Sequence, residues 1–129
     1  MTLENSLFPH LGWKAGLLLV VVTLAGCGGK APSPKATAQQ LENSFAKADA
    51  AVKQEVAQAS TALQSGNFAQ AIIVMNQLPR QQPLDEAQRQ AMSRLIQQTR
   101  QAVNQNPKLN SPELYKAMSE MILRVHGEN

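Results

Sequence analysis

The chain has 129 residues, of which 43% are hydrophobic and 16% charged, and its formal net charge is +3 at pH 7. This length allows one small domain and excludes a second. The pI near 9.3 does not indicate nucleic-acid binding, because the basic residues are scattered among acidic ones instead of being clustered.

An apolar run follows the polar amino-terminal residues 1–14. Residues 15–25 carry no charge over eleven positions. A membrane-spanning helix needs about twenty apolar residues, whereas the core of a secretory signal peptide needs about seven to fifteen. The length therefore favours an export signal. The alternative is an uncleaved signal anchor formed by residues 11–26, with Trp13 and Lys14 at the interface.

The run ends at Leu24-Ala25-Gly26-Cys27, which resembles the lipobox of bacterial lipoproteins. The resemblance covers residues 1–27 and implies that residues 1–26 are a lipoprotein signal peptide. In that family a dedicated peptidase recognises the three residues before the cysteine and cuts there. The thiol of Cys27 is joined to a diacylglycerol, and in many bacteria the new amino group is acylated as well, typically with palmitate. The family's amino-terminal segment is usually shorter and more basic than this one, in which Glu4 opposes Lys14.

Lipid on Cys27 would place the protein on a membrane of the cell envelope. Two or more acyl chains give stable attachment, since each buried methylene contributes about 0.8 kcal/mol. As the only cysteine of an exported chain, Cys27 has no internal disulfide partner, and lipid modification would protect its thiol from oxidation. The next residue, Gly28, is not the aspartate that resembles an inner-membrane retention signal in enteric Gram-negative lipoproteins. This favours the periplasmic face of the outer membrane if the organism is Gram-negative.

Residues 27–38 are predicted to be the lipidated cysteine and a flexible linker. They combine Gly, Pro, Ser and Lys without an apolar period, and the Pro32-Ser33-Pro34 segment favours an extended conformation. A recognition motif over residues 32–35 is the alternative. The helical domain is expected to begin at residue 39.

Apolar residues then recur every three or four positions, which predicts one long amphipathic helix ending near Ser65. The recurring residues are Leu41, Phe45, Ala48, Val52, Val56, Ala59 and Leu63. Gly66 suits the left-handed position that follows a helix. A second, shorter helix begins at Phe68 and stops before Pro79. The short turn predicts an antiparallel hairpin.

This hairpin resembles a single tetratricopeptide repeat, a family of protein-binding modules. The turn pattern appears as Gly66-Asn67-Phe68 followed by Ala71, the small packing residues as Ala59 and Ala62, and the later positions as Met75, Leu78 and Pro83. The family's large aromatic residue near the start of the first helix is replaced by Glu55. The resemblance covers one repeat, whereas about three are normally needed to bury the repeat faces.

Two further helices complete the domain. Asp85 with Gln88 forms a capping-box pattern for a helix reaching about Gln105. Ser111 before Pro112 predicts the start of the last helix, which ends at Gly127. The prediction is therefore an all-α bundle of about four helices over residues 39–129. The expected leading core residues are Phe45, Val52, Leu63, Phe68, Ile72 and Leu78.

No pattern of catalytic, cofactor-binding or metal-binding residues is recognisable, so the chain is not predicted to be an enzyme. His126, the only histidine after Cys27, is interpreted as a solvated end residue. The methionines at 75, 92, 118 and 121 are expected in the core, with an adaptable binding surface as the alternative. Glutamines crowd the third helix and its approach, at positions 81, 82, 88, 90, 97, 98, 101 and 105, and they form either a neutral solvated face or a surface for a protein or a glycan.

Three hypotheses about function follow. The first is a lipid-anchored interaction module that binds another envelope protein, which an exposed apolar groove would support. The second is a structural envelope lipoprotein without a specific protein ligand, which binds cell-wall polymer or fills a packing role, and a uniformly polar exterior would favour it. The third is a small-molecule binder, which needs an enclosed pocket. No nucleic-acid partner and no small-molecule substrate is evident from the sequence.

Overall fold

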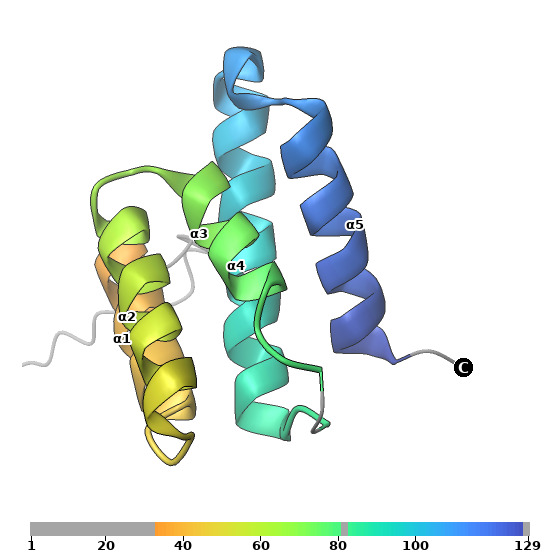
Figure 1. The fold of residues 1–129 in the computed structure, drawn as a ribbon. Coiled ribbons are helices and arrows are strands. Elements are labelled where there is room, and N and C mark those ends of the chain that lie inside the picture. The colour runs from red at the N-terminus through yellow and green to blue at the C-terminus, as the bar shows by residue number, and fades with distance from the viewer. Residues whose placement is uncertain (1–32, 81–82, 128–129) are drawn as a thin grey trace, which may run out of the picture. The chain divides into compact units, whose positions relative to one another are not determined.

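The computed structural model describes residues 33–80 and 83–127. These residues form five α-helices and one short 3-10 helix, without a strand (Figure 1). The elements are α1 Pro34–Ser44, α2 Ala50–Gln64, α3 Phe68–Asn76, α4 Glu86–Gln105, η3 Pro107–Leu109 and α5 Pro112–His126. The predicted all-α bundle is confirmed. The signal peptide, the lipobox residues Leu24, Ala25 and Gly26, and Cys27 lie outside the described residues.

The first predicted helix is wrong as a single element, because it is two helices that meet at a turn. α1 ends at Ser44 and α2 begins at Ala50, after Asp49, whose side chain accepts a hydrogen bond from the Val52 amide at 3.0 Å. The turn lets α1 fold back along α2. The apolar period continues through the turn because both helices face the same core, so periodicity alone did not reveal the break.

The helical part also begins earlier than predicted. Ser33 caps α1 by accepting a hydrogen bond from the Ala36 amide at 3.1 Å, and Pro34 occupies the first helical turn. This is the same serine–proline start that the sequence analysis recognised at Ser111. The linker predicted for residues 27–38 therefore ends too late, since residues 34–38 are helical and Ala38 is fully buried.

The predicted α2–α3 hairpin is confirmed, and its turn is a complete Schellman motif. The Gly66 amide donates to the Leu63 carbonyl at 3.0 Å, and the Asn67 amide donates to the Ala62 carbonyl at 2.8 Å. Gly66 has φ +81°. Asn67 then caps α3, because its side chain accepts from the Gln70 amide at 3.1 Å. These bonds satisfy backbone groups at both helix ends and reverse the chain within a few residues.

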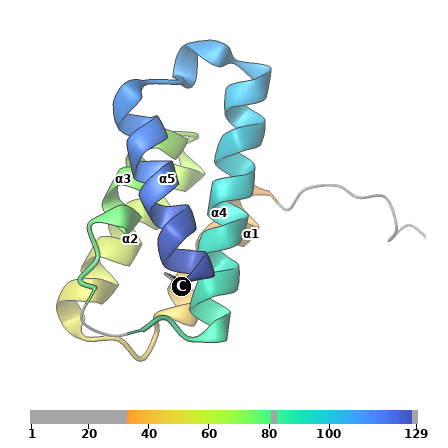
Figure 2. The same cartoon turned by 90° about the vertical axis from the view of Figure 1, so that its right-hand side faces the viewer.

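The starts of the last two α-helices are also as predicted. Asp85 and Gln88 form the reciprocal capping box of α4, with backbone-to-side-chain distances of 2.8 and 3.1 Å. Ser111 caps α5 by accepting from the Leu114 amide at 3.1 Å, and the helix ends at Gly127. The start of α4 and the end of α5 lie at the same end of the bundle (Figure 2).

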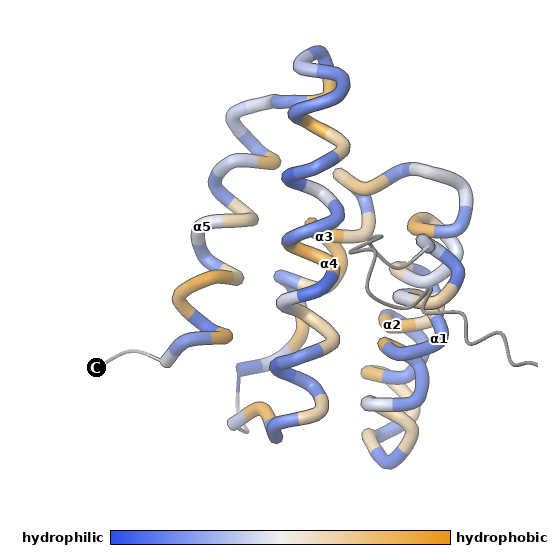
Figure 3. Tube along the Cα trace, turned by 180° about the vertical axis from the view of Figure 1, so that it is seen from behind, coloured by the Kyte–Doolittle hydropathy of each residue, from blue (hydrophilic) through white to orange (hydrophobic). Residues whose placement is uncertain are grey.

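The core is shared by all five α-helices. α1 packs against α2 and α4, α3 packs against α2, α4 and α5, and α4 packs against α5. Four of the six expected core residues are buried, namely Phe45, Leu63, Ile72 and Leu78. Val52 and Phe68 are half-buried and pack against that core. In Figure 3 the hydrophobic residues of the helices interleave with hydrophilic ones, as expected of amphipathic helices.

Replacing Gly66 with alanine should destabilise the domain by about 1 kcal/mol, because a Cβ disfavours positive φ. No described atom lies within 4 Å of that Cβ, so the loss comes from the backbone conformation alone. Urea denaturation followed by circular dichroism measures it. Gly66→Asn should lose less, because asparagine tolerates this region. Equal stability of Gly66→Ala and wild type would contradict the account.

Candidate binding groove

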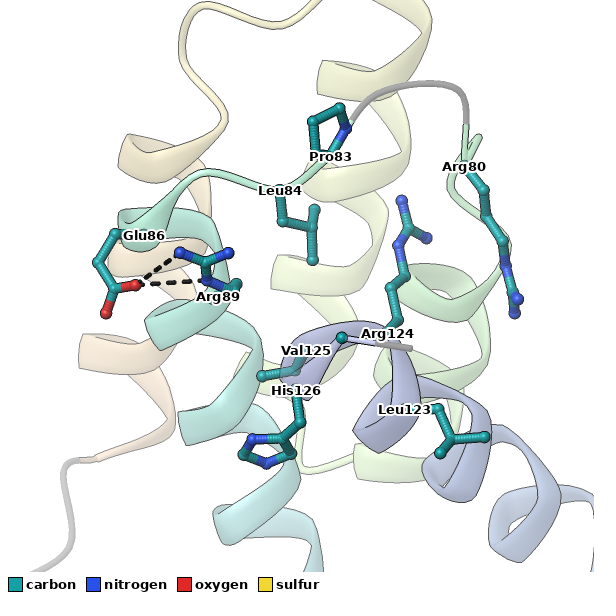
Figure 4. A pocket seen from close by; sticks show the side chains of 10 residues that line it. Arg80, Pro83, Leu84, Glu86, Arg89, Leu123, Arg124, Val125 and His126 are labelled. Carbon is teal, nitrogen blue, oxygen red and sulfur yellow. Dashed lines mark hydrogen bonds and ion pairs between the residues drawn. The ribbon is translucent and has the colours of Figure 1, made fainter. Parts of the chain in front are cut away.

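Two stretches of chain distant in sequence meet at one end of the bundle and form an open groove. The loop after α3 and the first turn of α4 follow one another and form one stretch, and the last turn of α5 forms the other (Figure 4). The groove has a volume of about 630 Å³. Arg80, Pro83 and Leu84 contribute from the loop, and Glu86 and Arg89 contribute from α4. The end of α5 contributes the remainder, from Leu123 to Gly127.

Arg124 holds the groove together by joining α5 to the segment that follows α3. Its Nη1 donates to the Leu78 carbonyl at 2.9 Å, and its Nη2 donates to the Pro79 carbonyl at 2.8 Å. Both carbonyls follow the end of α3 and lie beyond its helical hydrogen bonds. The guanidinium supplies two donors in a fixed geometry, which one ammonium group cannot reproduce. Arg124 therefore joins α5 to the residues that follow α3, in addition to lining the groove.

Cationic side chains predominate in the groove. Arg80, Arg89 and Arg124 line it together with His126, and Glu86 is the one carboxylate among the described lining residues. Burial lowers the pKa of Arg124, and the charge of nearby Arg80 lowers it further. The two guanidinium groups therefore repel each other.

Each of the other two arginines has one acidic neighbour. The Nη2 of Arg80 lies 3.7 Å from Glu120 Oε2, an oxygen that also accepts a 2.7 Å hydrogen bond from Asn76 Nδ2. This ion pair is loose, and the Arg80 side chain is 55% exposed. Arg89 donates twice to Glu86 Oε2, at 2.9 and 3.3 Å. Exposed pairs of this kind contribute little stability, because water screens them.

Glu86 stays ionised more readily than an ordinary glutamate. A hydrogen bond from Gln90 lowers its pKa most, followed by the hydrogen bonds and charge of Arg89. The Gln90 amide donates to Glu86 Oε1 at 2.9 Å. Glu86 thus occupies only part of the hydrogen-bonding capacity of Arg89, since a guanidinium has five N–H donors.

Apolar surface continues from the groove along α5. Leu123 lines the groove and is 58% exposed, and Tyr115, two turns earlier on the same helix, is 66% exposed. Met118 and Ile122 are half-buried between them. Large hydrophobic side chains are otherwise buried or half-buried among the described residues, apart from Leu109 in η3, which is 40% exposed. The exposed apolar surface is thus concentrated on α5.

The other residues considered from sequence fall into three groups. Met75, Met92 and Met121 are fully buried, which confirms their core role, and Met118 is half-buried. His126 is exposed at the end of α5. The glutamines at 90, 97, 101 and 105 are exposed on α4, but Gln88 is half-buried and Gln98 is buried, so the predicted glutamine face is wrong for these two; those at 81 and 82 lie outside the described residues.

The groove was not predicted from the sequence, because the end of α5 lies far along the chain from the α3–α4 loop and the start of α4 that complete it. Arg80 and Arg124 lie 44 positions apart, and nothing in the local pattern around either residue indicates the other. One partial signal was available, since Leu123 interrupts the polar outer face expected near the end of the last helix. Within residues 33–80 and 83–127, no group of three or more His, Cys, Asp or Glu residues is placed to hold a metal ion.

Comparison with protein-family models, with curated proteins and with solved structures found no match to this chain. In the part of the chain that the structure describes, none of the helices combines the length and the apolar character required to cross a bilayer. The groove itself is therefore the basis for a functional interpretation of the domain.

Replacing Arg124 with alanine should lower the free energy of unfolding by about 1–2 kcal/mol, because the Leu78 carbonyl loses its donor in a partly buried position. Chemical denaturation measures the loss. Arg100→Ala, at an exposed position on α4, is the matched control and should stay within about 0.5 kcal/mol of wild type. Equal losses of unfolding free energy in the two variants would contradict this structural role of Arg124.

Proposed function

We propose that this protein is a bacterial lipoprotein whose helical domain binds another protein of the cell envelope. The attachment would be a lipid on Cys27, and the resemblance of Leu24-Ala25-Gly26-Cys27 to a lipobox supports it. The observation that carries the binding role is the exposed apolar surface of α5 beside the groove. Tyr115 and Leu123 are both more than half exposed there, and exposed apolar surface next to charged residues is typical of protein interaction sites.

The α2–α3 hairpin gives weaker support to the same role. It combines the glycine turn that resembles a tetratricopeptide repeat with two closely packed antiparallel helices. Such hairpins commonly serve as scaffolds for binding surfaces. In this protein the surface would lie on α5 and at the groove, not on the hairpin itself.

A second candidate function is a structural lipoprotein that contacts cell-wall polymer. The exposed glutamines at 90, 97, 101 and 105 of α4 favour it. Their amides could donate and accept hydrogen bonds with a polar glycan without attracting ions. Retention of the purified protein on insoluble peptidoglycan, and its loss when two of these glutamines are replaced by glutamate, would favour this candidate.

Cys27→Ser should abolish labelling of the protein by radioactive palmitate and release it from the membrane fraction, because the oxygen of serine does not receive the diacylglycerol. Mass spectrometry of the wild-type protein should show an amino terminus at Cys27 carrying lipid. A wild-type protein that still begins at Met1, or that carries an unmodified thiol, would overturn the lipoprotein assignment.

Crosslinking in membranes followed by pull-down tests the binding role. The wild-type protein should capture a defined partner, and Leu123→Asp should lose it, because a buried contact would then contain an unpaired charge. Leu109→Asp makes the same change at another exposed leucine, in η3, and should retain the partner. Circular dichroism should be unchanged in both variants. The same capture by all three proteins would contradict a binding role for α5.

A further inference from the structure

The groove combines positive charge with an apolar wall, and this combination indicates the chemistry of its occupant. Arg80 and Arg124 lie on one side of the groove and Arg89 on the other, with Leu84 between Arg89 and Arg124 and Leu123 on the same side as Arg80 (Figure 4). An anionic group would be attracted to the arginines, and an apolar side chain beside it would cover the exposed Leu123. Neither a purely charged nor a purely apolar ligand would use both features.

The arginines retain donors for a ligand. Arg124 uses one hydrogen atom of Nη1 and one of Nη2 on carbonyl groups, which leaves three of its five N–H donors. Arg80 is held only by the loose contact with Glu120. A carboxylate between Arg80 and Arg124 would reduce the repulsion that lowers the pKa of Arg124. Bidentate pairing of guanidinium and carboxylate is among the strongest polar contacts in proteins.

The groove lies near the end of α1 that is opposite to its first residue, Pro34. The chain enters α1 at Pro34, and α1 is about 16 Å long at 1.5 Å per residue. Phe45, which follows the other end of α1, shares a small cavity of about 90 Å³ with Pro83, Leu84 and Arg124 of the groove region. Figure 1 likewise shows the α1–α2 turn, the α3–α4 loop and the end of α5 at the same end of the bundle.

The size and the open form of the groove favour a peptide segment as its occupant. The volume of about 630 Å³ is enough for a few side chains of a peptide. Its open form also allows an extended segment to lie across it.

We propose that the groove binds a short acidic segment of a partner protein, with its carboxylates on Arg80 and Arg89 and an apolar side chain against Leu123. This inference rests on the proposed binding function and adds the chemical class of the ligand. Arg124 takes part through its remaining donors, while its bonds to the Leu78 and Pro79 carbonyls keep the groove in shape.

The test uses the full-length chain in a neutral detergent and fluorescence anisotropy with two labelled peptides. One peptide repeats glutamate and leucine, and the other repeats lysine and leucine. The Glu-Leu peptide should bind, and its affinity should fall as salt rises, because the contacts are between charges. The Lys-Leu peptide should not bind. Equal binding of the two peptides would overturn the inference.

The double variant Arg80→Gln and Arg89→Gln should weaken binding of the Glu-Leu peptide by about tenfold. The matched control, Lys53→Gln with Arg100→Gln, removes the same charge from exposed positions of α2 and α4 outside the groove. It should change the affinity by less than about twofold. Leu123→Ser should weaken the Glu-Leu peptide but not a glutamate-only peptide. Equal effects of the groove and control variants would overturn the inference.

Adding phosphatidylglycerol to the micelles distinguishes a lipid headgroup from a peptide. The Glu-Leu peptide should stay bound, and its displacement by this lipid but not by phosphatidylcholine would overturn the inference in favour of an anionic lipid. The inference of an acidic ligand and the proposed binding function can fail independently of each other. Loss of partner capture in Leu123→Asp together with no peptide binding would refute only the acidic ligand, since the partner would then bind through other chemistry.

Discussion

The bundle depends on the burial of α3. This helix of nine residues, Phe68–Asn76, packs against α2, α4 and α5. Ala71, Ile72 and Met75 are fully buried in it and Val74 nearly so. Each large apolar side chain that leaves water contributes about 1.5–3 kcal/mol, and a helix of this length would not be stable alone. The surrounding helices are therefore needed to cover α3, and their arrangement follows from that requirement.

The groove is a consequence of how the chain leaves this buried helix. After α3 the backbone emerges at Leu78 and Pro79, whose carbonyls need donors because the helix has ended. Arg124 reaches them from α5 and fixes the last turn of that helix against the loop. The same requirement brings a second guanidinium, from Arg80, near the first. A stabilising contact thereby creates a positively charged surface suited to an anionic partner.

Some of the buried and half-buried polar groups are satisfied by their own helices, which limits their functional significance. Thr99 is fully buried on α4, and its hydroxyl donates to the Leu95 carbonyl at 2.8 Å. Ser44 similarly donates to the Leu41 carbonyl at 3.0 Å at the end of α1. Such residues weaken an apolar pattern in the sequence without marking a site. The proposed interaction surface lies where apolar and charged side chains are exposed together, at the end of α5.

The features that the sequence determined by itself are those made by neighbouring residues. The left-handed position of Gly66, the capping box of Asp85 and the start of α5 at Ser111 were all predicted, because each depends on residues within a few positions. The break before Asp49 was missed although a capping residue was present, since the apolar period runs through it.

Only the tertiary structure decided the direction of α1, the exposure of Leu123 and the meeting of Arg80 with Arg124. Each depends on which helix faces cover α3, and α3 brings together segments more than forty positions apart. A local pattern shows that a helix has an apolar face, but not which helix will cover it. Tertiary packing determines which helix covers that face, and the groove forms only when the helices have packed.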